Sequence, residues 1–282
     1  MNVPAYIALC RPIQWLKNLM LFFPAFLGGT FFRPGSFHVG AVSFISFGMA
    51  SSSSYVLNDI LDRFNDANHP TKKYRPLPSG HVSVAAAYFL CLLLLSAGAV
   101  LAFSVSLSFG LFVLVYVAVQ LSYSLRLKEV AILDIFCIAA GFLLRLEAGG
   151  LVFHVDVSSW LFLSVFLLAL FLSTGKRLGE IEILGERAGE HRRCLTSYPP
   201  GFLEGVMYMT GGSVMVTYTM FVMSRHTLVY TVPLCCFGLF RYVYRIKSGL
   251  GGDPTEALTK DLPLFTTSAL WGLMIWYGYY RQ

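Results

Sequence analysis

Acidic and amide side chains recur at a four-residue interval in one polar stretch of this sequence. Asn58, Asp62 and Asp66 are spaced so that a helix would place their oxygen atoms along one face, and Asp59 lies beside them. Carboxylates this close together repel one another unless a cation sits among them. Mg²⁺ is a hard cation that takes one or two carboxylates and completes its shell with water and phosphate oxygens. The stretch therefore predicts a Mg²⁺ site formed by Asn58, Asp59, Asp62 and Asp66, the alternative being a solvated acidic helix end between membrane spans.

Basic side chains stand before this stretch, directly after it and again later in the sequence. They are Lys17, Lys72, Lys73, Arg75, Lys128, Lys176 and Arg177. Lys and Arg bind phosphate oxygens and neutralise the charge that builds on a leaving diphosphate. We therefore expect a diphosphate-bearing substrate, with Asp62 and Asp66 as catalytic candidates and Asp134 as a group that orients or assists.

A second polar stretch begins with Gly175-Lys176-Arg177 and offers Glu180 as its first acid. Glu182, Glu186 and Glu190 again keep a four-residue period. The sequence leaves open whether these later glutamates bind metal or face water.

Composition identifies the elements that must position these residues. Of 282 residues, 56% are hydrophobic and 13% are charged, and the mean hydropathy is +0.65, whereas soluble domains average roughly 25% charged residues. Apolar runs of about 20 residues predict membrane spans. These runs cover roughly 13–32, 38–57, 83–103, 107–125, 130–152, 158–175, 201–224, 227–246 and 263–280. We predict an all-α bundle of nine transmembrane helices, one domain over residues 1–282, with polar motif loops at 58–80 and 176–200.

Nearly all Lys and Arg residues fall on one side of this nine-span layout. The positive-inside rule then places the N-terminus and both motif loops in the cytoplasm and the C-terminus outside. We expect an integral protein of a bacterial inner membrane with its active site facing the cytoplasm. The net charge of +6 follows from this topology, so no nucleic-acid partner is expected, and a homo-oligomer stays open.

Two further ionisable residues, Arg145 and Glu147, lie deep inside the fifth span. A charge at that depth is costly and usually faces a cavity or a partner. One interpretation is an internal Arg–carboxylate pair that holds the bundle together. The other is a site for a lipid phosphate that includes Arg145.

The motifs resemble those of the UbiA superfamily of intramembrane prenyltransferases. The resemblance rests on Asn58-Asp59-x-x-Asp62-x-x-x-Asp66, Arg75-Pro76, Ser79-Gly80 and Tyr123-Ser124-x-x-Leu127-Lys128. It implies a bundle of nine transmembrane helices in which two acidic motifs in cytoplasmic loops bind Mg²⁺ and a diphosphate. It also implies a substrate-binding role for Tyr123.

The second motif departs from the usual pattern of that superfamily, because it contains Lys176 and Arg177 where Asp residues are typical. The blocks Arg11-Pro12-x-Gln14-Trp15-x-Lys17-Asn18 and Leu133-Asp134 through Arg145 are similar to the decaprenyl-phosphate phosphoribosyltransferase branch. That branch implies 5-phosphoribosyl diphosphate as donor and a polyprenyl phosphate as acceptor.

This resemblance leads to a division of roles among the basic residues. Lys72 or Lys73 and Arg75 would support the diphosphate, while Lys176, Arg177 and Glu180 would bind the phosphoribosyl part. Lys17, Lys128 and Arg145 are the candidates for the lipid phosphate.

Two alternatives remain open at this stage. The first is a prenyltransferase that attaches a polyprenyl chain to an aromatic acceptor such as 4-hydroxybenzoate, which would consume prenyl diphosphate. The second is a transporter that uses Asp134, Arg145 and Glu147 as an intramembrane relay. Thermal stabilisation of the protein by each candidate donor, with and without Mg²⁺, distinguishes the phosphoribosyltransferase from the aromatic prenyltransferase and the transporter.

Overall fold

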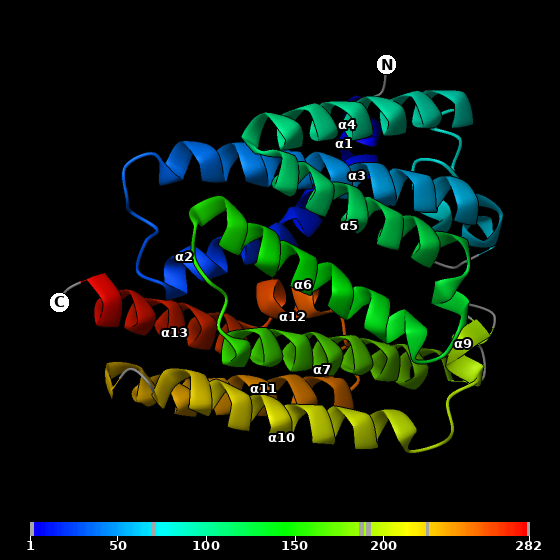
Figure 1. Cartoon of the computed structure of the whole chain (residues 1–282). Coiled ribbons are helices and arrows are strands. Elements are labelled where there is room, and N and C mark those ends of the chain that lie inside the picture. Colours follow the sequence, from blue (N-terminus) through cyan, green and yellow to red (C-terminus); the bar gives the residue numbers. More distant parts are fainter. Residues whose placement is uncertain (1–2, 69–71, 186–188, 190–192, 224–225, 281–282) are drawn as a thin grey trace. The chain divides into compact units, whose positions relative to one another are not determined.

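The computed structural model describes residues 3–68, 72–185, 189, 193–223 and 226–280. Every element in these residues is a helix (Figure 1), which confirms the predicted all-α class. The chain divides into two compact units. The first unit contains Met1–Phe23, Phe31–Lys128 and Leu144–Val155, and the second contains Pro24–Thr30, Glu129–Leu143 and Asp156–Gln282. The single domain over residues 1–282 stays a prediction.

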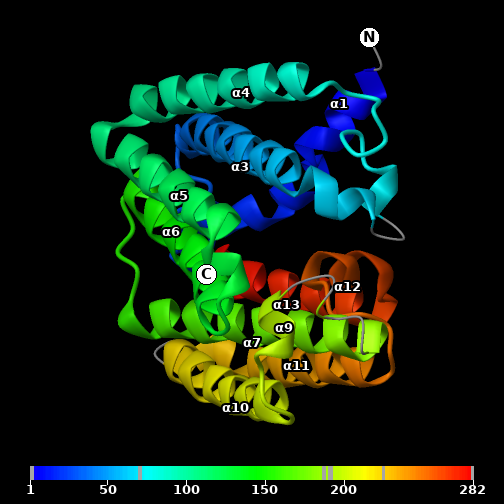
Figure 2. The same cartoon turned by 90° about the vertical axis from the view of Figure 1, so that its right-hand side faces the viewer.

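The first unit is arranged around one long helix, α3. Its elements are α1 (Val3–Cys10), the 3₁₀ helix η1 (Pro12–Phe22), α3 (Ser36–Ala67), η2 (Lys72–Tyr74), α4 (Val84–Val105), α5 (Leu107–Leu125), η3 (Leu127–Glu129) and the C-terminal part of α6 (Leu133–Phe153). Helix α3 contacts α1, η1, η2, α4 and α5, and Figure 2 shows α4 lying along it.

Small residues allow α3 and α4 to pack closely. A Cβ atom added to Gly98 of α4 would lie 3.1 Å from the Ser46 carbonyl oxygen and 3.2 Å from the Ala50 nitrogen. The Ser46 hydroxyl donates a hydrogen bond of 2.8 Å to the Gly98 carbonyl oxygen. Close backbone approach and hydrogen bonds across helices are the usual basis of helix association in membranes. They fix α3, and with it the acidic motif near its C-terminal end.

The second unit is a helical bundle built on α7. Its elements are α2 (Phe23–Leu27), the N-terminal part of α6, α7 (Ser159–Leu184), α9 (Arg193–Thr196), α10 (Phe202–Met223), the 3₁₀ helix η5 (His226–Thr231), α11 (Val232–Lys247), α12 (Pro254–Lys260) and α13 (Leu262–Tyr280). Helix α7 lies along α10, and α11 contacts both (Figures 1 and 2). Phe171, Met207 and Tyr242 are among the buried side chains where these three helices meet.

The first predicted span, 13–32, is not one continuous α-helix. Residues from Pro12 form the 3₁₀ helix η1, and the short helix α2 follows. Pro24 has no backbone N–H and therefore interrupts the α-helical hydrogen-bond ladder inside the predicted span. In η1 the Trp15 indole donates to the Ser52 hydroxyl at 2.9 Å, which attaches this segment to α3.

Five helices of the described residues are long and apolar enough to cross a membrane. They are α4, α5, α6, α7 and α10. The count of nine spans and the orientation of the termini therefore stay predictions. The expected motif loops begin later than predicted, because α3 continues to Ala67 and α7 continues to Leu184. The segments 58–66 and 176–182 therefore lie on helices, where their charged side chains include Asp62 and Arg177 with partners.

Candidate functional site

The acidic motif occupies the last turns of α3 in the first unit. Asp59 and Asp66 are buried, with 2% and 3% of their surface exposed, and Asp62 is half-buried. The helix ends where the Asn68 backbone N–H contacts the carbonyl oxygens of Asn65 and Asp66. The predicted spacing on a helix is therefore present, and the partners of each carboxylate decide how the motif is used.

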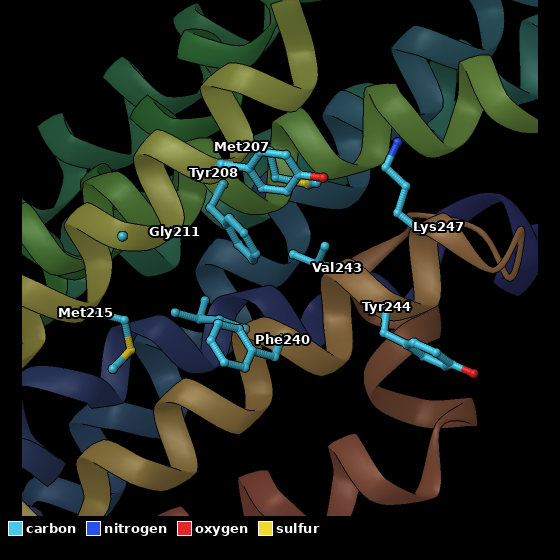
Figure 3. A pocket seen from close by; sticks show the side chains of 11 residues that line it. Met207, Tyr208, Gly211, Met215, Phe240, Val243, Tyr244 and Lys247 are labelled. Atoms are coloured by element: carbon cyan, nitrogen blue, oxygen red, sulfur yellow. The ribbon is translucent and has the colours of Figure 1, made fainter. Parts of the chain in front are cut away.

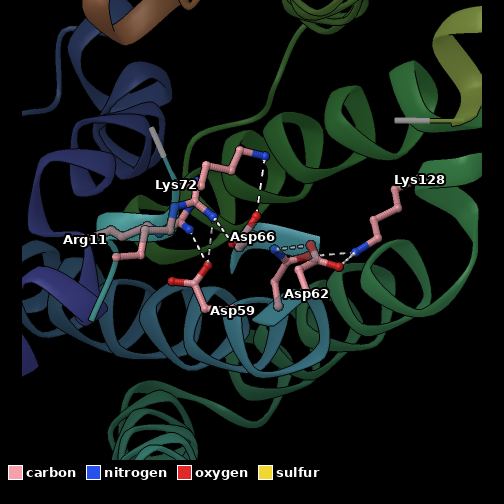
Figure 4. A network of polar contacts seen from close by, with 8 residues as sticks. Arg11, Asp59, Asp62, Asp66, Lys72 and Lys128 are labelled. Atoms are coloured by element: carbon pink, nitrogen blue, oxygen red, sulfur yellow. Dashed lines mark hydrogen bonds and ion pairs between the residues drawn. The ribbon is translucent and has the colours of Figure 1, made fainter. Parts of the chain in front are cut away.

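Arg75 connects two of the carboxylates. Its Nη1 atom donates to Asp66 at 2.6 Å and to Asp59 at 3.3 Å. Residues seven apart lie about two turns apart on the same side of a helix, so one guanidinium reaches both. Arg11 donates to Asp59 as well, and the Lys72 ammonium lies 3.7 Å from Asp66 (Figure 4).

The other half of the motif is held by Lys128 of η3. Its ammonium donates to Asp62 at 2.5 Å and to the Asn58 amide oxygen at 3.3 Å. The Asn58 amide nitrogen in turn donates to Asp62 at 3.0 Å. Asn58, Asp62 and Asp66, expected to act as one row of oxygens, therefore have different cations as partners (Figure 4). Asn58 and Asp62 contact Lys128, whereas Asp66 shares Arg75 with Asp59.

This cluster on α3 brings three carboxylates together with four cations. The cations are Arg11, Lys72, Arg75 and Lys128. Burial raises the pKa of the Asp59 carboxyl above its usual value, while the charges of Arg11 and Arg75 act in the opposite direction. The excess of positive charge over carboxylates suits a substrate that brings its own negative charge.

The oxygen donors of the cluster fit Mg²⁺. Asn58, Asp59, Asp62 and Asp66 offer carboxylate and amide oxygens, which are the ligands that hard cations prefer. Within the described residues, no three His, Cys, Asp or Glu side chains are close enough to hold an ion by themselves. Mg²⁺ uses one or two carboxylates and takes its other ligands from water and substrate phosphates.

Arg145 lies in a separate buried cluster of the first unit. Its guanidinium donates to the amide oxygen of Asn18 at 2.7 Å, to the Tyr116 hydroxyl at 2.8 Å and to the Ser51 hydroxyl at 3.3 Å. Asn18 is fully buried, and its Nδ2 atom has no hydrogen-bond partner among the described residues. The cluster joins α6 to η1, α3 and α5. Lys17, next to Asn18, is half-buried.

Two further candidate residues of the first unit are Lys73 on η2 and Tyr123 on α5. The Lys73 side chain is exposed and its ammonium lies 5.2 Å from the centre of the Tyr74 ring. Of the two neighbouring lysines, Lys72 is therefore the one that reaches the motif. Tyr123 is half-buried near the end of α5.

In the second unit, Asp134 is the centre of a buried polar cluster. Arg177 donates to it at 2.5 Å, and the Tyr198 hydroxyl donates to its other oxygen at 2.6 Å. Arg177 also donates to Glu180 at 2.9 Å. Asp134 and Arg177 are 0% and 1% exposed. Asp134 of α6 thus connects Arg177 of α7 with Tyr198 in the segment before α10. The burial of Arg177 distinguishes it from the exposed cations.

Lys176 has a different environment from its neighbour Arg177. Its ammonium is partly exposed and donates to Asp253 at 2.8 Å. Glu182 accepts a hydrogen bond of 2.8 Å from Lys247. The glutamates at 186 and 190, like His69 and Pro70 before η2, lie outside the described residues.

Sequence reasoning missed Arg11, Tyr198 and Asp253 as partners of the candidate residues. Arg11 stands in an Arg-Pro pair before the first apolar run, which is a weak signal. No local pattern relates Tyr198 to Asp134, 64 positions away, or Asp253 to Lys176, 77 positions away. Only the packing of the second unit shows these pairs.

An apolar groove of about 570 Å³ lies between α10 and α11 of the second unit (Figure 3). Met207, Tyr208, Phe240 and Tyr244 line it, with Lys247 at one end. The Lys247 ammonium contacts Glu182 and Glu204 at 2.8 and 3.2 Å, so its charge is balanced by protein carboxylates. The groove lacks the excess of cations that distinguishes the cluster on α3.

Comparison with known proteins identifies the family. A family model described as the UbiA prenyltransferase family matches residues 21–269. The chain belongs to the UbiA prenyltransferase family. It is therefore an integral membrane protein and a transferase, as its motifs and its five long apolar helices indicate.

Relatives of this UbiA family member carry more specific names. This chain is 33% identical over 287 residues to the decaprenyl-phosphate phosphoribosyltransferase of Mycolicibacterium smegmatis, and the alignment covers 95% of this chain and 90% of that protein. It is 31% identical over 280 residues to the protein of the same name from Corynebacterium glutamicum, with 93% and 82% covered.

The fold is also that of solved members of the family. The structure of a UbiA homolog from Archaeoglobus fulgidus bound to GPP and Mg²⁺ matches with a TM-score of 0.77 and 23% identity, covering 98% of both chains. A second structure of an Archaeoglobus fulgidus UbiA homolog, bound to DMAPP and Mg²⁺, gives a TM-score of 0.75 at 22% identity. At this identity the likeness shows a shared fold.

Proposed function

We propose that this protein transfers a phosphoribosyl group from 5-phosphoribosyl diphosphate to a polyprenyl phosphate and releases diphosphate. The observation that carries the proposal is the cluster on α3, in which four cations surround three carboxylates. Such a cluster suits a diphosphate that arrives with Mg²⁺. The names of relatives at 33% and 31% identity support the choice of donor and acceptor.

The residues of the first unit would have separate roles in binding the metal and the diphosphate. Asn58, Asp59, Asp62 and Asp66 would offer the oxygen ligands, of which one or two carboxylates would hold Mg²⁺, and the ion when bound would supply positive charge to the diphosphate. Lys72 and Arg75, which already contact Asp66, would bind phosphate oxygens when the carboxylates turn to the metal. These cations would stabilise the charge that develops on the leaving diphosphate.

In the second unit, Lys176 is the cation that we assign to a phosphate of the donor. Its side chain is about one-third exposed, at 32%, whereas that of Arg177 is 1% exposed. Arg177 and Asp134 would therefore act by positioning α7 rather than by touching substrate. Glu180, which accepts from Arg177, would share that role.

The chemistry requires little from a general base. An oxygen of the lipid phosphate forms a bond to the anomeric carbon of the ribose, and the bond from that carbon to the diphosphate oxygen breaks with the electron pair leaving on diphosphate. A phosphate is ionised at neutral pH, so no side chain has to remove a proton first. The residues contribute by binding, orientation and charge stabilisation.

We also propose that the motif faces the cytoplasm of a bacterial inner membrane. The distribution of Lys and Arg along the sequence supports this orientation. 5-Phosphoribosyl diphosphate is a polyanion that does not cross a bilayer by itself, which agrees with a site on the side where it is made.

The test is a transfer assay on purified protein with radiolabelled 5-phosphoribosyl diphosphate, polyprenyl phosphate and Mg²⁺. We expect a labelled lipid that disappears when EDTA removes divalent cations and returns with added Mg²⁺. Asp62→Asn, which removes the charge that faces Lys128, should lower kcat/KM by at least about 100-fold. Asp156→Asn, at an exposed carboxylate between α6 and α7, is the matched control and should keep wild-type activity.

A single contrary result would reject this proposal. If the wild-type protein forms no labelled lipid but consumes geranyl diphosphate with an aromatic acceptor, the protein is a prenyl diphosphate-dependent transferase. That alternative has the support of a shared fold with a structure bound to GPP and Mg²⁺. It predicts that 5-phosphoribosyl diphosphate neither stabilises the protein nor competes with the prenyl donor.

A further inference from the structure

The segment between α11 and α12 lies directly against the end of α7 in the second unit. A Cβ atom added to Gly252 would lie 2.3 Å from the carbonyl oxygen of Gly175 and 2.9 Å from the Cα atom of Lys176. A Cβ atom added to Gly179 would lie 2.6 Å from the Gly252 nitrogen. The two backbones therefore touch at glycines on both sides, and this contact includes the backbone of Lys176 itself.

Further contacts fix this segment in place. The Tyr242 hydroxyl lies 2.6 Å from the Gly252 carbonyl oxygen and 3.0 Å from that of Leu172. Arg245 donates to the Leu250 carbonyl oxygen at 2.8 Å. Gly251 has a φ angle of +82°, a left-handed conformation that favours glycine. The segment is thus built to hold one conformation against α7.

This backbone conformation fixes the position of Asp253. Its Oδ1 atom accepts the backbone N–H groups of Thr255 and Glu256 at 3.0 and 3.1 Å and so caps α12. Its Oδ2 atom accepts the Lys176 ammonium at 2.8 Å. The two oxygens of this carboxylate therefore contact different groups, and the backbone cap orients the oxygen that faces Lys176.

We infer that Asp253 is a positioning residue that sets the place of the Lys176 ammonium for binding a phosphate of the donor. The polar stretch on α7 that begins Gly175-Lys176-Arg177 offers Glu180 as its first acid, and the α11–α12 segment brings the carboxylate of Asp253 to Lys176 from elsewhere in the chain. This inference rests on the proposed function, in which Lys176 binds donor phosphate.

Asp253→Asn separates the positioning role from the capping role. Asparagine caps a helix about as well as aspartate does, so the contacts with Thr255 and Glu256 survive. The amide lacks the negative charge that holds Lys176. We expect the KM for 5-phosphoribosyl diphosphate to rise roughly fivefold, while kcat and the KM for the lipid change by less than about twofold.

The control is Glu256→Gln on the same helix, α12. It removes the exposed contact of 2.7 Å between Glu256 and Lys260 and leaves Asp253 intact. Its KM for the donor should equal that of the wild type. Asp253→Asn and Glu256→Gln should have equal melting temperatures, whereas Asp253→Ala, which loses the cap, should melt lower.

A double-mutant cycle with Lys176→Met completes the test. If Asp253 acts through Lys176, Asp253→Asn adds no further rise in the donor KM once Lys176 is replaced. An active wild type whose Asp253→Asn variant keeps its donor KM contradicts this inference alone. A wild type that forms no phosphoribosylated lipid contradicts the proposed function and this inference with it.

Discussion

At the scale of single residues, the cluster on α3 is defined by shared cations. Arg75 contacts both Asp59 and Asp66, and Lys128 contacts both Asn58 and Asp62. Buried carboxylates are tolerated only when they are paired, because burial removes the water that would otherwise solvate their charge. The same cations are the groups that a diphosphate would recruit, so structure and function depend on the same side chains.

Arg75→Ala should destabilise the protein as well as impair transfer. The substitution leaves Asp66 with Lys72 at 3.7 Å and Asp59 with Arg11, and both carboxylates are almost fully buried. The Arg75 side chain is 28% exposed, so we expect a moderate loss of about 1–3 kcal/mol in the free energy of unfolding. Thermal unfolding in detergent measures it.

Arg63→Ala is the matched control for this substitution. The Arg63 guanidinium lies 4.3 Å from the centre of the neighbouring Phe64 ring on the same helix. Its removal should change the melting temperature little. Equal melting temperatures for the Arg75 and Arg63 variants would show that the bridge between Asp59 and Asp66 does not stabilise the first unit.

At the scale of elements, glycines decide how closely helices approach. Gly149 of α6 faces η1, where a Cβ atom would lie 2.1 Å from the Leu21 carbonyl oxygen. Because that oxygen belongs to the backbone, it can move away only if η1 moves. The contact therefore helps to place η1, which carries Lys17 and Asn18, against the part of α6 that carries Arg145.

Gly149→Ala should therefore separate α6 from η1. Overpacking of this kind costs about 1–3 kcal/mol, and the shift of η1 should weaken the contact between Asn18 and Arg145. The control is Gly205→Ala in α10, where no other part of the described structure lies within 4 Å of the added Cβ. Alanine there should leave stability unchanged or raise it by up to about 1 kcal/mol. Thermal unfolding of both variants in detergent is the measurement, and a Gly149 variant as stable as the Gly205 variant would contradict the close contact.

At the scale of the whole molecule, the membrane sets the constraint. Helix α4 has 22 residues and is therefore roughly 33 Å long, enough for a hydrocarbon core of about 30 Å. Ser79 precedes α4 and Ser108 lies in the first turn of α5, so these two exposed residues stand near opposite ends of a spanning helix.

This placement gives a test of orientation. In a variant without its native cysteines, Ser79→Cys and Ser108→Cys should react with a membrane-impermeant maleimide from opposite sides. If the acidic motif is cytoplasmic, Ser108→Cys reacts in intact cells, whereas Ser79→Cys reacts only in inverted vesicles. The reverse pattern would contradict the orientation that we propose from the Lys and Arg distribution.

The sequence by itself determined the class of the fold and the position of the acidic motif. Apolar runs predict spanning helices because a bilayer admits only segments that satisfy their own backbone hydrogen bonds. The four-residue spacing of Asn58, Asp62 and Asp66 predicted that they lie on one face of a helix, because an α-helix has 3.6 residues per turn. The basic pair Lys176 and Arg177 at the start of the second polar stretch was also readable, since it needs only the order of residues.

Tertiary structure decided which charges meet. Lys176 and Arg177 are neighbours in sequence, but one is buried against Asp134 and the other contacts Asp253. The cations around Asp59 and Asp66 come from before α3 and after it, and Tyr198 reaches Asp134 over 64 positions. Pair energies depend on distance and burial, and both are set by helix packing, which no local pattern of residues encodes.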